Sequence, residues 1–456
     1  ILEEEIKRGF QLGPRTEYMA EISQLFCELT GHERVGFTNS GTEAIMIALR
    51  LARAATGRDK IVIFDRAYNG HSDGTLAESF RGPDGELISK PVAAGIPKNV
   101  AKDVIVLDYG NPESLVTIRQ YAHELAAVLV EPVQSRRLDL QPIEFLRELR
   151  ALTKALDVAL IFDEMVSGFR AHPAGVQGLF NIKADIATYG KIVGGGTPIG
   201  AVAGDARYLD GIDGGMWQYG DASYPTAKRT YFGGTFCQHP FSMAACLATL
   251  RHLKAEGPAL QERLTQRTAA FAQTLNTFFQ EEEIALRVVT FASTFGFKFP
   301  GNLEVFYYHL LDKGVYIWEW RACFFSTAHT DEDINFVIQA IKETIQEMRD
   351  GGFFPPKSGQ SKPTLALNTS KAAIATAVTA ISSTNVTATT SAINKSAQFG
   401  LYFFGNYDAA FSQDKYDLMI QGGRYADQNG FSAIWLPERH FDKFGGFSPN
   451  PSLLAA

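Results

Sequence analysis

The sequence has 456 residues, of which 45% are hydrophobic and 20% are charged, and its formal net charge is −7. This composition is typical of a soluble globular protein of two or three domains, and the lack of a basic tract argues against nucleic-acid binding. No run of about 18 apolar residues occurs, which argues against a membrane-spanning helix. The four cysteines form no CxxC pair, so we expect no metal site, no disulfide framework and a cytoplasmic location.

Short apolar runs alternate with helical patterns over the first 350 residues. This alternation predicts an α/β fold whose mostly parallel sheet is covered on both faces. From residue 259 onward, helices and strands follow in an order that predicts a smaller C-terminal α+β lobe. The predicted strands of the first part are 60–65, 103–108, 125–133, 158–165, 185–191 and 200–204, with helices such as 41–56 and 142–157. The predicted elements of the lobe are a helix at 259–281, two strands in 285–299, a helix at 303–313, a strand at 315–318 and a helix at 331–350.

The composition changes after residue 350. Residues 351–397 are rich in Ser, Thr, Ala and Pro and contain few aromatic residues, so they cannot bury enough apolar surface to fold and are predicted to be a linker. Residues 398–456 then predict a strand, a helix and a second strand. We interpret this last part as the first β-α-β unit of a truncated, TIM-like barrel domain.

A possible phosphate site begins at Ser40. Ser40 and Glu43 have the spacing of a capping box, and Gly41 and Thr42 lie between them at the start of the predicted helix. Backbone N–H groups and hydroxyls at a helix N-terminus bind phosphate well. The alternative interpretation is a well-capped helix without a ligand.

Two strand ends carry the most reactive residue types. Asp163 ends the run "VALIFDEM", and Lys191 follows at the end of the next predicted strand. The run at Asp163 is similar to a Walker B strand, but the only Gly-Lys pair, Gly190–Lys191, is not part of a P-loop, so an ATPase is not supported. A partly desolvated lysine facing an aspartate is the pattern for pyridoxal phosphate, because the amine forms an imine and the carboxylate keeps the ring nitrogen protonated. A simple surface carboxylate is the alternative for Asp163.

The motifs as a set resemble a known family. "NSGTEA", "AYNGHSDG", "EPV", "FDEMVSGFR", "YGKIVGGGTPIGAVAG", "FGGTFCQHP" and "FFSTAHTDEDI" occur in the order and at the spacing of class III aminotransferases of the glutamate-1-semialdehyde aminomutase type. The resemblance covers residues 1–350 and implies a fold-type I transferase that uses pyridoxal 5′-phosphate.

The resemblance also implies a role for individual residues. Lys191 would be the Schiff-base lysine and proton shuttle, and Asp163 would pair with the ring nitrogen. Ser40, Gly41 and Thr42 would bind the phosphate. Gly234 and Thr235 would reach the phosphate from a neighbouring subunit, which implies a homodimer. The other cofactor-binding residues implied are Tyr68, which would stack on the ring, the adjacent Asn69, Glu131 near the ring hydroxyl, and Met165 on the opposite ring face.

The sequence departs from the family in three places. The family's N-terminal segment is missing before residue 1, so the chain is interpreted as a piece of a longer protein. The segment "EPVQSRRLDLQP" replaces one that contains glycine, and Arg321 stands where mutase-like members have a glutamate. We expect Arg321 to bind a substrate carboxylate or a carrier's phosphate, or to be a surface arginine.

These departures resemble aminotransferase domains of hybrid polyketide/nonribosomal peptide synthases that make β-amino fatty acids. The resemblance implies amination of a β-ketoacyl thioester carried on an acyl or peptidyl carrier domain, with glutamate or glutamine as amino donor. The alternatives are an aminomutase acting on a small free substrate and an inactive module of a megasynthase.

Residues 398–456 resemble the start of a luciferase-like, FMN-dependent monooxygenase. The resemblance rests on the motif "WLPERHF", which would place Glu438, Arg439 and His440 at the end of the second strand. An ordinary charged strand end is the alternative.

Overall fold

The computed structural model describes residues 1–355, except 11, 14, 85, 86 and 302, and then residues 357, 400–402, 424, 428 and 433–435. The chain divides into two units, Ile1–Thr364 and Leu365–Ala456, which are treated separately below. Within the described ranges, no helix is both long enough and apolar enough to cross a membrane.

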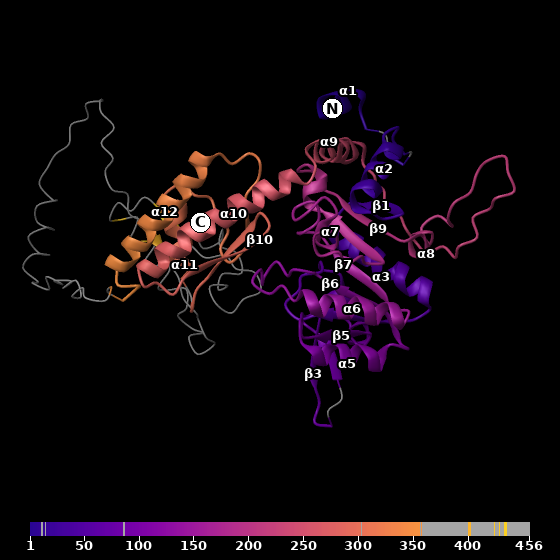
Figure 1. The fold of residues 1–456 in the computed structure, drawn as a ribbon, viewed down its shortest axis with the longest axis horizontal. Helices are drawn as coiled ribbons and strands as arrows, with labels where there is room; N and C mark the ends of the chain where they lie inside the picture. The colour runs from indigo at the N-terminus through magenta and orange to yellow at the C-terminus, as the bar shows by residue number, and fades with distance from the viewer. Residues whose placement is uncertain are drawn as a thin grey trace, which may run out of the picture. The chain divides into compact units, whose positions relative to one another are not determined.

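The first unit is built on a seven-stranded sheet, which confirms the predicted α/β fold (Figure 1). Each of the predicted strands of this part is present. The five strands β8, β7, β6, β2 and β5 are parallel, whereas β9 runs antiparallel to both of its neighbours, β8 and β1. In spatial order the strands are β1 (Arg34–Thr38), β9 (Gly200–Gly204), β8 (Ile186–Gly190), β7 (Ala159–Asp163), β6 (Leu125–Val130), β2 (Lys60–Phe64) and β5 (Val104–Leu107).

Helices cover both faces of this sheet, so its central strands are buried on both sides. Ile161 belongs to the cluster formed with α3 (Gly41–Thr56), and its neighbours Leu160 and Phe162 belong to the cluster on the other face. This alternation explains why the strand is apolar at every position. The helices that contribute to the second cluster include α2 (Met19–Thr30), α5 (Pro112–Tyr121), α6 (Ile143–Ala155) and α9 (Pro240–Glu256).

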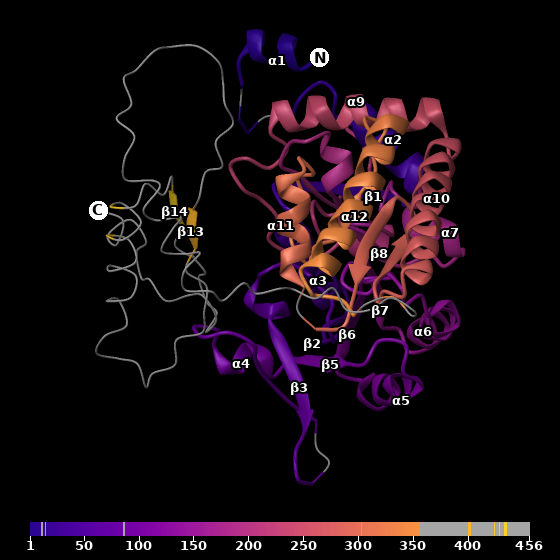
Figure 2. The same cartoon turned by 90° about the vertical axis from the view of Figure 1, so that its left-hand side faces the viewer.

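Several elements of the first unit were not predicted. Strand β1 escaped prediction because it starts with Arg34 and contains Gly36, although pairing with β9 buries its last three residues. A hairpin of β3 (Ala77–Arg81) and β4 (Leu87–Pro91) projects from the lower end of the views in Figures 1 and 2. The short helices are α1 (Leu2–Arg8), η1 (Asp73–Thr75), α4 (Lys98–Ala101), α7 (Gly175–Phe180), η2 (Lys191–Gly194) and α8 (Ala206–Leu209).

The smaller lobe confirms the predicted α+β pattern with one correction. Residues 315–318 are not a strand: Tyr316 is 95% exposed, and the Val315 N–H donates to the Leu310 carbonyl at 2.8 Å. The third strand of the lobe is β12 instead, because it occupies the free edge of β11. The elements of the lobe are α10 (Ala259–Glu281), β10 (Arg287–Phe291), β11 (Thr294–Lys298), α11 (Glu304–Asp312), β12 (Cys323–Phe324) and α12 (Asp331–Asp350).

In the second unit, β13 (Gly400–Tyr402) pairs in parallel with β14 (Ala433–Trp435). Both strands fall within the two predicted for residues 398–456, and parallel pairing requires a crossover connection such as the predicted helix. Residues Glu438, Arg439 and His440 lie outside the described residues, as does most of the segment 351–397. The linker, its boundaries and the barrel therefore stay predictions.

The contact between β9 and the start of α3 leaves no room for a side chain at Gly200. A Cβ atom built there would lie 2.1 Å from the Ser40 carbonyl oxygen and 2.4 Å from Thr38 Oγ1. We expect Gly200→Ala to destabilise the protein by about 3 kcal/mol in chemical denaturation, because the backbone at Ser40 must move. The control is Gly296→Ala on β11, where the added atom would meet only Leu138, at 3.9 Å. Equal stability of the two variants would contradict this packing.

Candidate active site

The carboxyl ends of two adjacent parallel strands place Asp163 and Lys191 at the same edge of the sheet. Strand β7 ends at Asp163, whose partner in the register is Thr188 of β8, and Lys191 follows β8 directly. Ligands bind at this edge in open α/β sheets. Lys191 has a φ of 49°, in the left-handed region, so the chain turns sharply at the reactive residue. A turn of this kind is a strained conformation that is frequent at functional sites.

Asp163 is a buried carboxylate held by two donors. The residue is 2% exposed, and its Oδ2 accepts from Asn69 Nδ2 at 2.8 Å, while its Oδ1 accepts from the Met165 N–H at 3.1 Å. Burial raises the pKa of Asp163, and both hydrogen bonds and the nearby Lys191 oppose that rise. A buried carboxylate that hydrogen bonds hold in place suits a cationic N–H donor, such as a protonated pyridine nitrogen.

Lys191 has the opposite shift. The residue itself is exposed, but the atoms crowded around it displace part of the water of its ammonium group, and this lowers its pKa. The carboxylates of Asp163 and Glu131 oppose the decrease, whereas the guanidinium of Arg170 adds to it. A larger neutral fraction makes the amine a better nucleophile.

The predicted phosphate site lies at the start of α3. Ser40 Oγ accepts from the Glu43 N–H at 3.3 Å, but the Glu43 carboxylate accepts from the Asn39 N–H at 2.8 Å instead of from Ser40, so only half of the predicted capping box forms. The Thr42 hydroxyl accepts from the His71 N–H at 3.3 Å, which joins the helix start to the turn that follows Asn69. The N–H groups at the start of a helix have no partner within the helix and suit a phosphate.

Met165 lies between this helix start and Lys191. A Cβ atom at Gly41 or at Gly190 would lie 2.8 Å from Met165 Sδ. An alanine at either position would therefore require the Met165 side chain to move. This places Met165 between the start of α3 and the end of β8, and its role at a ring face stays a prediction.

Tyr68 and Glu131 are joined through the backbone. The Tyr68 N–H donates to Glu131 Oε2 at 3.3 Å, and the Ser135 N–H donates to Glu131 Oε1 at 2.8 Å. Glu131 is 4% exposed, and burial, together with the charge of Asp163, raises its pKa to about 7. The Tyr68 ring is half exposed and is free to contact a ligand.

The remaining predicted residues lie apart from this group. Gly234 and Thr235 are exposed in a segment without helix or strand, and a Cβ atom at Gly234 would lie 3.6 Å from Asn39 Nδ2, beside the start of α3. Arg321 is exposed, with its guanidinium carbon 4.9 Å from the centre of the Trp318 ring. Among the described residues, no hydrogen bond or ion pair joins the Arg321 side chain to the crevice.

Sequence reasoning missed two residues of the crevice. Gln134 is fully buried, and its Nε2 donates to the Asp65 carbonyl at 2.8 Å, while its Oε1 has no partner among the described atoms. Arg170 donates from Nε to the Val166 carbonyl at 3.0 Å and from Nη1 to Ser293 Oγ at 3.2 Å, which ties the crevice to the smaller lobe. Gln134 follows "EPV" directly, and Arg170 ends "FDEMVSGFR", so both lay within motifs that were already noted.

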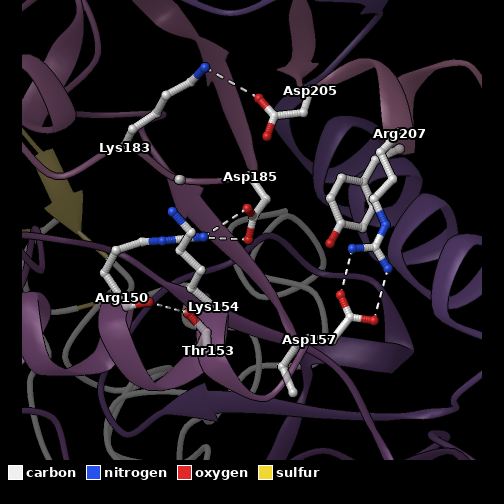
Figure 3. A pocket seen from close by; sticks show the side chains of 11 residues that line it. Arg150, Thr153, Lys154, Asp157, Lys183, Asp185, Asp205 and Arg207 are labelled. Carbon is white, nitrogen blue, oxygen red and sulfur yellow. Dashed lines mark hydrogen bonds and ion pairs between the residues drawn. The ribbon is translucent and has the colours of Figure 1, made fainter.

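A separate polar hollow of about 480 Å³ lies at the opposite edge of the sheet, near the starts of β7 and β8 (Figure 3). Of its charged side chains, all but Lys154 form ion pairs with one another. The pairs are Arg150–Asp185, Lys183–Asp205 and Arg207–Asp157. Because these charges neutralise each other far from Lys191, we interpret the hollow as a structural ion-pair network.

The crevice residues fit pyridoxal phosphate part by part. The Lys191 amine would condense with the aldehyde, the buried Asp163 carboxylate suits the ring nitrogen, and the start of α3 suits the phosphate. The Gln134 oxygen remains for a further polar group. The fold and this site together define a fold-type I pyridoxal-phosphate-dependent transferase. The Aminotransferase class-III family matches residues 8–345, and the chain belongs to this family.

Known proteins support this assignment. The chain is 35% identical over 364 residues to glutamate-1-semialdehyde 2,1-aminomutase of Alkaliphilus oremlandii, covering 75% of this chain and 81% of the relative. It is 33% identical over 364 residues to the enzyme of the same name from Herminiimonas arsenicoxydans, with the same coverage. Among solved structures, an omega-transaminase from Sphaerobacter thermophilus is similar with a TM-score of 0.68 and 29% identity, over 76% of this chain and 82% of that one. A β-phenylalanine aminotransferase from Variovorax paradoxus has a TM-score of 0.65 and 27% identity, over 78% and 80%.

The raised pKa of Glu131 predicts a pH-dependent stability. The carboxyl ionises near 4.5 when unfolded and near 7 when folded, so its contribution to stability is lost as the pH rises through this interval, by about 3 kcal/mol in total. We expect Glu131→Gln to remove this loss, measured by chemical denaturation of the cofactor-free protein between pH 5 and pH 8. Glu148→Gln, an exposed position on α6, should retain the wild-type pH profile. Parallel profiles for Glu131→Gln and wild type would contradict the assignment.

Proposed function

We propose that residues 1–350 catalyse the transfer of an amino group with pyridoxal phosphate as cofactor. The observation that carries the proposal is the pair of adjacent strand ends, where the lowered pKa of Lys191 and the buried Asp163 carboxylate coincide. When bound, the cofactor supplies an aldehyde that condenses with amines and a ring that withdraws electrons.

Different residues of the chain would move the proton, stabilise the charge and contact the ring. Lys191 would take the proton from the substrate carbon and return it through its Nζ, because the residue follows the strand next to Asp163 and loss of water lowers its pKa. Asp163 would stabilise the positive charge on the ring nitrogen, and Asn69 keeps the carboxylate in place through its 2.8 Å hydrogen bond. Tyr68 and Met165 would contact the two faces of the ring.

The substrate that the comparisons favour is a small free molecule. The curated relatives at 33–35% identity are named glutamate-1-semialdehyde 2,1-aminomutases, and this supports a reaction of the aminomutase type for this chain. The small-substrate alternative of the sequence analysis is therefore better supported than the carrier-bound reaction.

The carrier-bound β-ketoacyl thioester remains the second candidate. Two features favour it: Arg321 stands in place of a glutamate, and the strands β13 and β14 pair in parallel where the start of an FMN-dependent monooxygenase is predicted. In that case, the partners are acyl or peptidyl carrier domains of the same assembly line, and glutamate or glutamine is the amino donor.

We also propose a homodimer in which Thr235 of one subunit contacts the cofactor phosphate of the other. The exposed segment around Thr235 supports it, because Trp217 (55% exposed), Tyr219 (95%), Tyr224 (79%) and Tyr231 (76%) leave a large aromatic surface uncovered.

Intact-mass and small-molecule mass spectrometry separate the two substrates. The protein is incubated with pyridoxal phosphate and either glutamate-1-semialdehyde or a β-ketoacyl carrier protein plus glutamate. Isomerisation of the semialdehyde without any amination of the carrier supports the small-substrate function. Conversion of the carrier-bound ketone into an amine would instead support the second candidate, the amination of a β-ketoacyl thioester. Failure of the protein to develop a visible absorbance band with pyridoxal phosphate would contradict both.

A further inference from the structure

An arginine beside the predicted ring-stacking residue has no assigned role. The guanidinium carbon of Arg136 lies 5.8 Å from the centre of the Tyr68 ring, which is a cation–π distance, and both side chains are exposed. Arg136 belongs to "EPVQSRRLDLQP", the segment in which this chain departs from the family pattern.

Three hydrogen bonds fix the loop that carries Arg136 relative to Tyr68. The Glu131 carboxylate accepts from both the Tyr68 and the Ser135 N–H groups, and the side chain of Gln134 donates to the Asp65 carbonyl at 2.8 Å. The position of the guanidinium next to the Tyr68 ring therefore follows from the backbone of the two loops and does not depend on the cation–π contact alone.

The carboxylates close to Arg136 in the loop are already engaged. Asp139 pairs with Arg287 at 3.0 Å and with Lys298 at 3.1 Å, and Glu131 is buried and accepts backbone N–H groups. Among the described residues, Arg136 has no ion pair. An exposed guanidinium beside the Tyr68 ring, with its planar donors free, is suited to bidentate binding of a carboxylate or a phosphate.

We propose that Arg136 is a specificity-determining residue that binds the anionic group of the substrate beside the Tyr68 ring. The inference rests on the proposed amino-transfer function and adds the substrate class: molecules with a negatively charged group beyond the reacting carbon. That group is either the carboxylate of a small amino donor or the phosphate of a pantetheine arm.

The test measures discrimination between charged and uncharged substrates. One arm compares L-glutamate with isopropylamine as amino donor, and the other compares a 3-oxoacyl pantetheine 4′-phosphate with the same thioester without phosphate. In the Arg136→Gln variant, we expect the KM for the charged substrate of one of these two comparisons to rise about tenfold, with kcat nearly unchanged. The KM for the uncharged substrate of the same comparison should stay constant. Arg136→Lys should recover part of the loss.

A matched control and a binding measurement complete the design. Arg119→Gln removes an exposed arginine from the last turn of α5, which leads to the amino end of β6 at the opposite edge of the sheet, and should behave as wild type. Calorimetric titration with glutarate, which carries no amine, reads out carboxylate binding without turnover and should weaken in Arg136→Gln if the carboxylate is the source.

A change in the amino-donor comparison identifies the carboxylate as the anion, and a change in the thioester comparison identifies the phosphate. Either result supports the proposal. Unchanged discrimination in both arms, or no discrimination by the wild type, overturns it. Formation of the visible absorbance band with pyridoxal phosphate in wild type and variant alike shows that the proposed function stands even if the role of Arg136 fails.

Discussion

Lys191→Ala is expected to reduce the rate of amino transfer by about 10⁴-fold, because the variant lacks both the amine that condenses with the cofactor and the base that moves the substrate proton. The Lys191 side chain is exposed and makes no ion pair within the described chain, so the free energy of unfolding should change by less than about 0.5 kcal/mol. Transamination assays and chemical denaturation of the same preparations measure the two effects.

Lys183→Ala is the matched control for this experiment. Lys183 precedes β8, whereas Lys191 follows it, and the Lys183 ammonium pairs at the surface with Asp205 at 3.3 Å. The control should retain nearly all of the wild-type activity. A Lys191→Ala protein with a tenth or more of the wild-type rate would contradict the catalytic role of Lys191.

Asp163→Asn is expected to lower the rate about 10³-fold, because a neutral amide cannot hold the positive charge on the ring nitrogen. Stability should change by no more than about 1 kcal/mol, since the Asn69 amide can rotate to present its oxygen to the new amide and a buried charge is removed. The readouts are single-turnover kinetics and denaturation of the cofactor-free protein.

Asp108→Asn provides the comparison for Asp163. Asp108 directly follows β5, so it also lies at the carboxyl end of a strand, but β5 is three positions from β7 in the sheet and Asp108 is exposed. This variant should leave the rate unchanged. If both variants lose activity equally, the effect is not specific to the ring nitrogen.

The central strands and the reactive pair were predictable because local sequence determines them. A run such as residues 158–165 is apolar throughout, since helices cover both of its faces, and the residue that ends a parallel strand must lie at the ligand-binding edge. The placement of Asp163 and Lys191 at this edge therefore followed from the predicted strands, whereas their catalytic roles stay predictions.

Other features depend on contacts that distant residues make. Strand β1 is short and is formed through its pairing with β9, far along the chain, and residues 315–318 are not a strand because β12 takes the edge of β11. The structure is needed to show that the Gln134 side-chain oxygen has no hydrogen-bond partner. It is also needed to show that Arg170 bonds to Ser293 of the smaller lobe. Sequence patterns carry no information on which side-chain atoms remain unpaired.

The most direct test of the central claim locates the attachment of the cofactor. The protein is incubated with pyridoxal phosphate, reduced with borohydride, digested and mapped by tandem mass spectrometry. We predict that the reduced adduct lies on Lys191 at one equivalent per chain, with no comparable modification elsewhere. A stoichiometric adduct on a different lysine, or none on Lys191, would contradict the account.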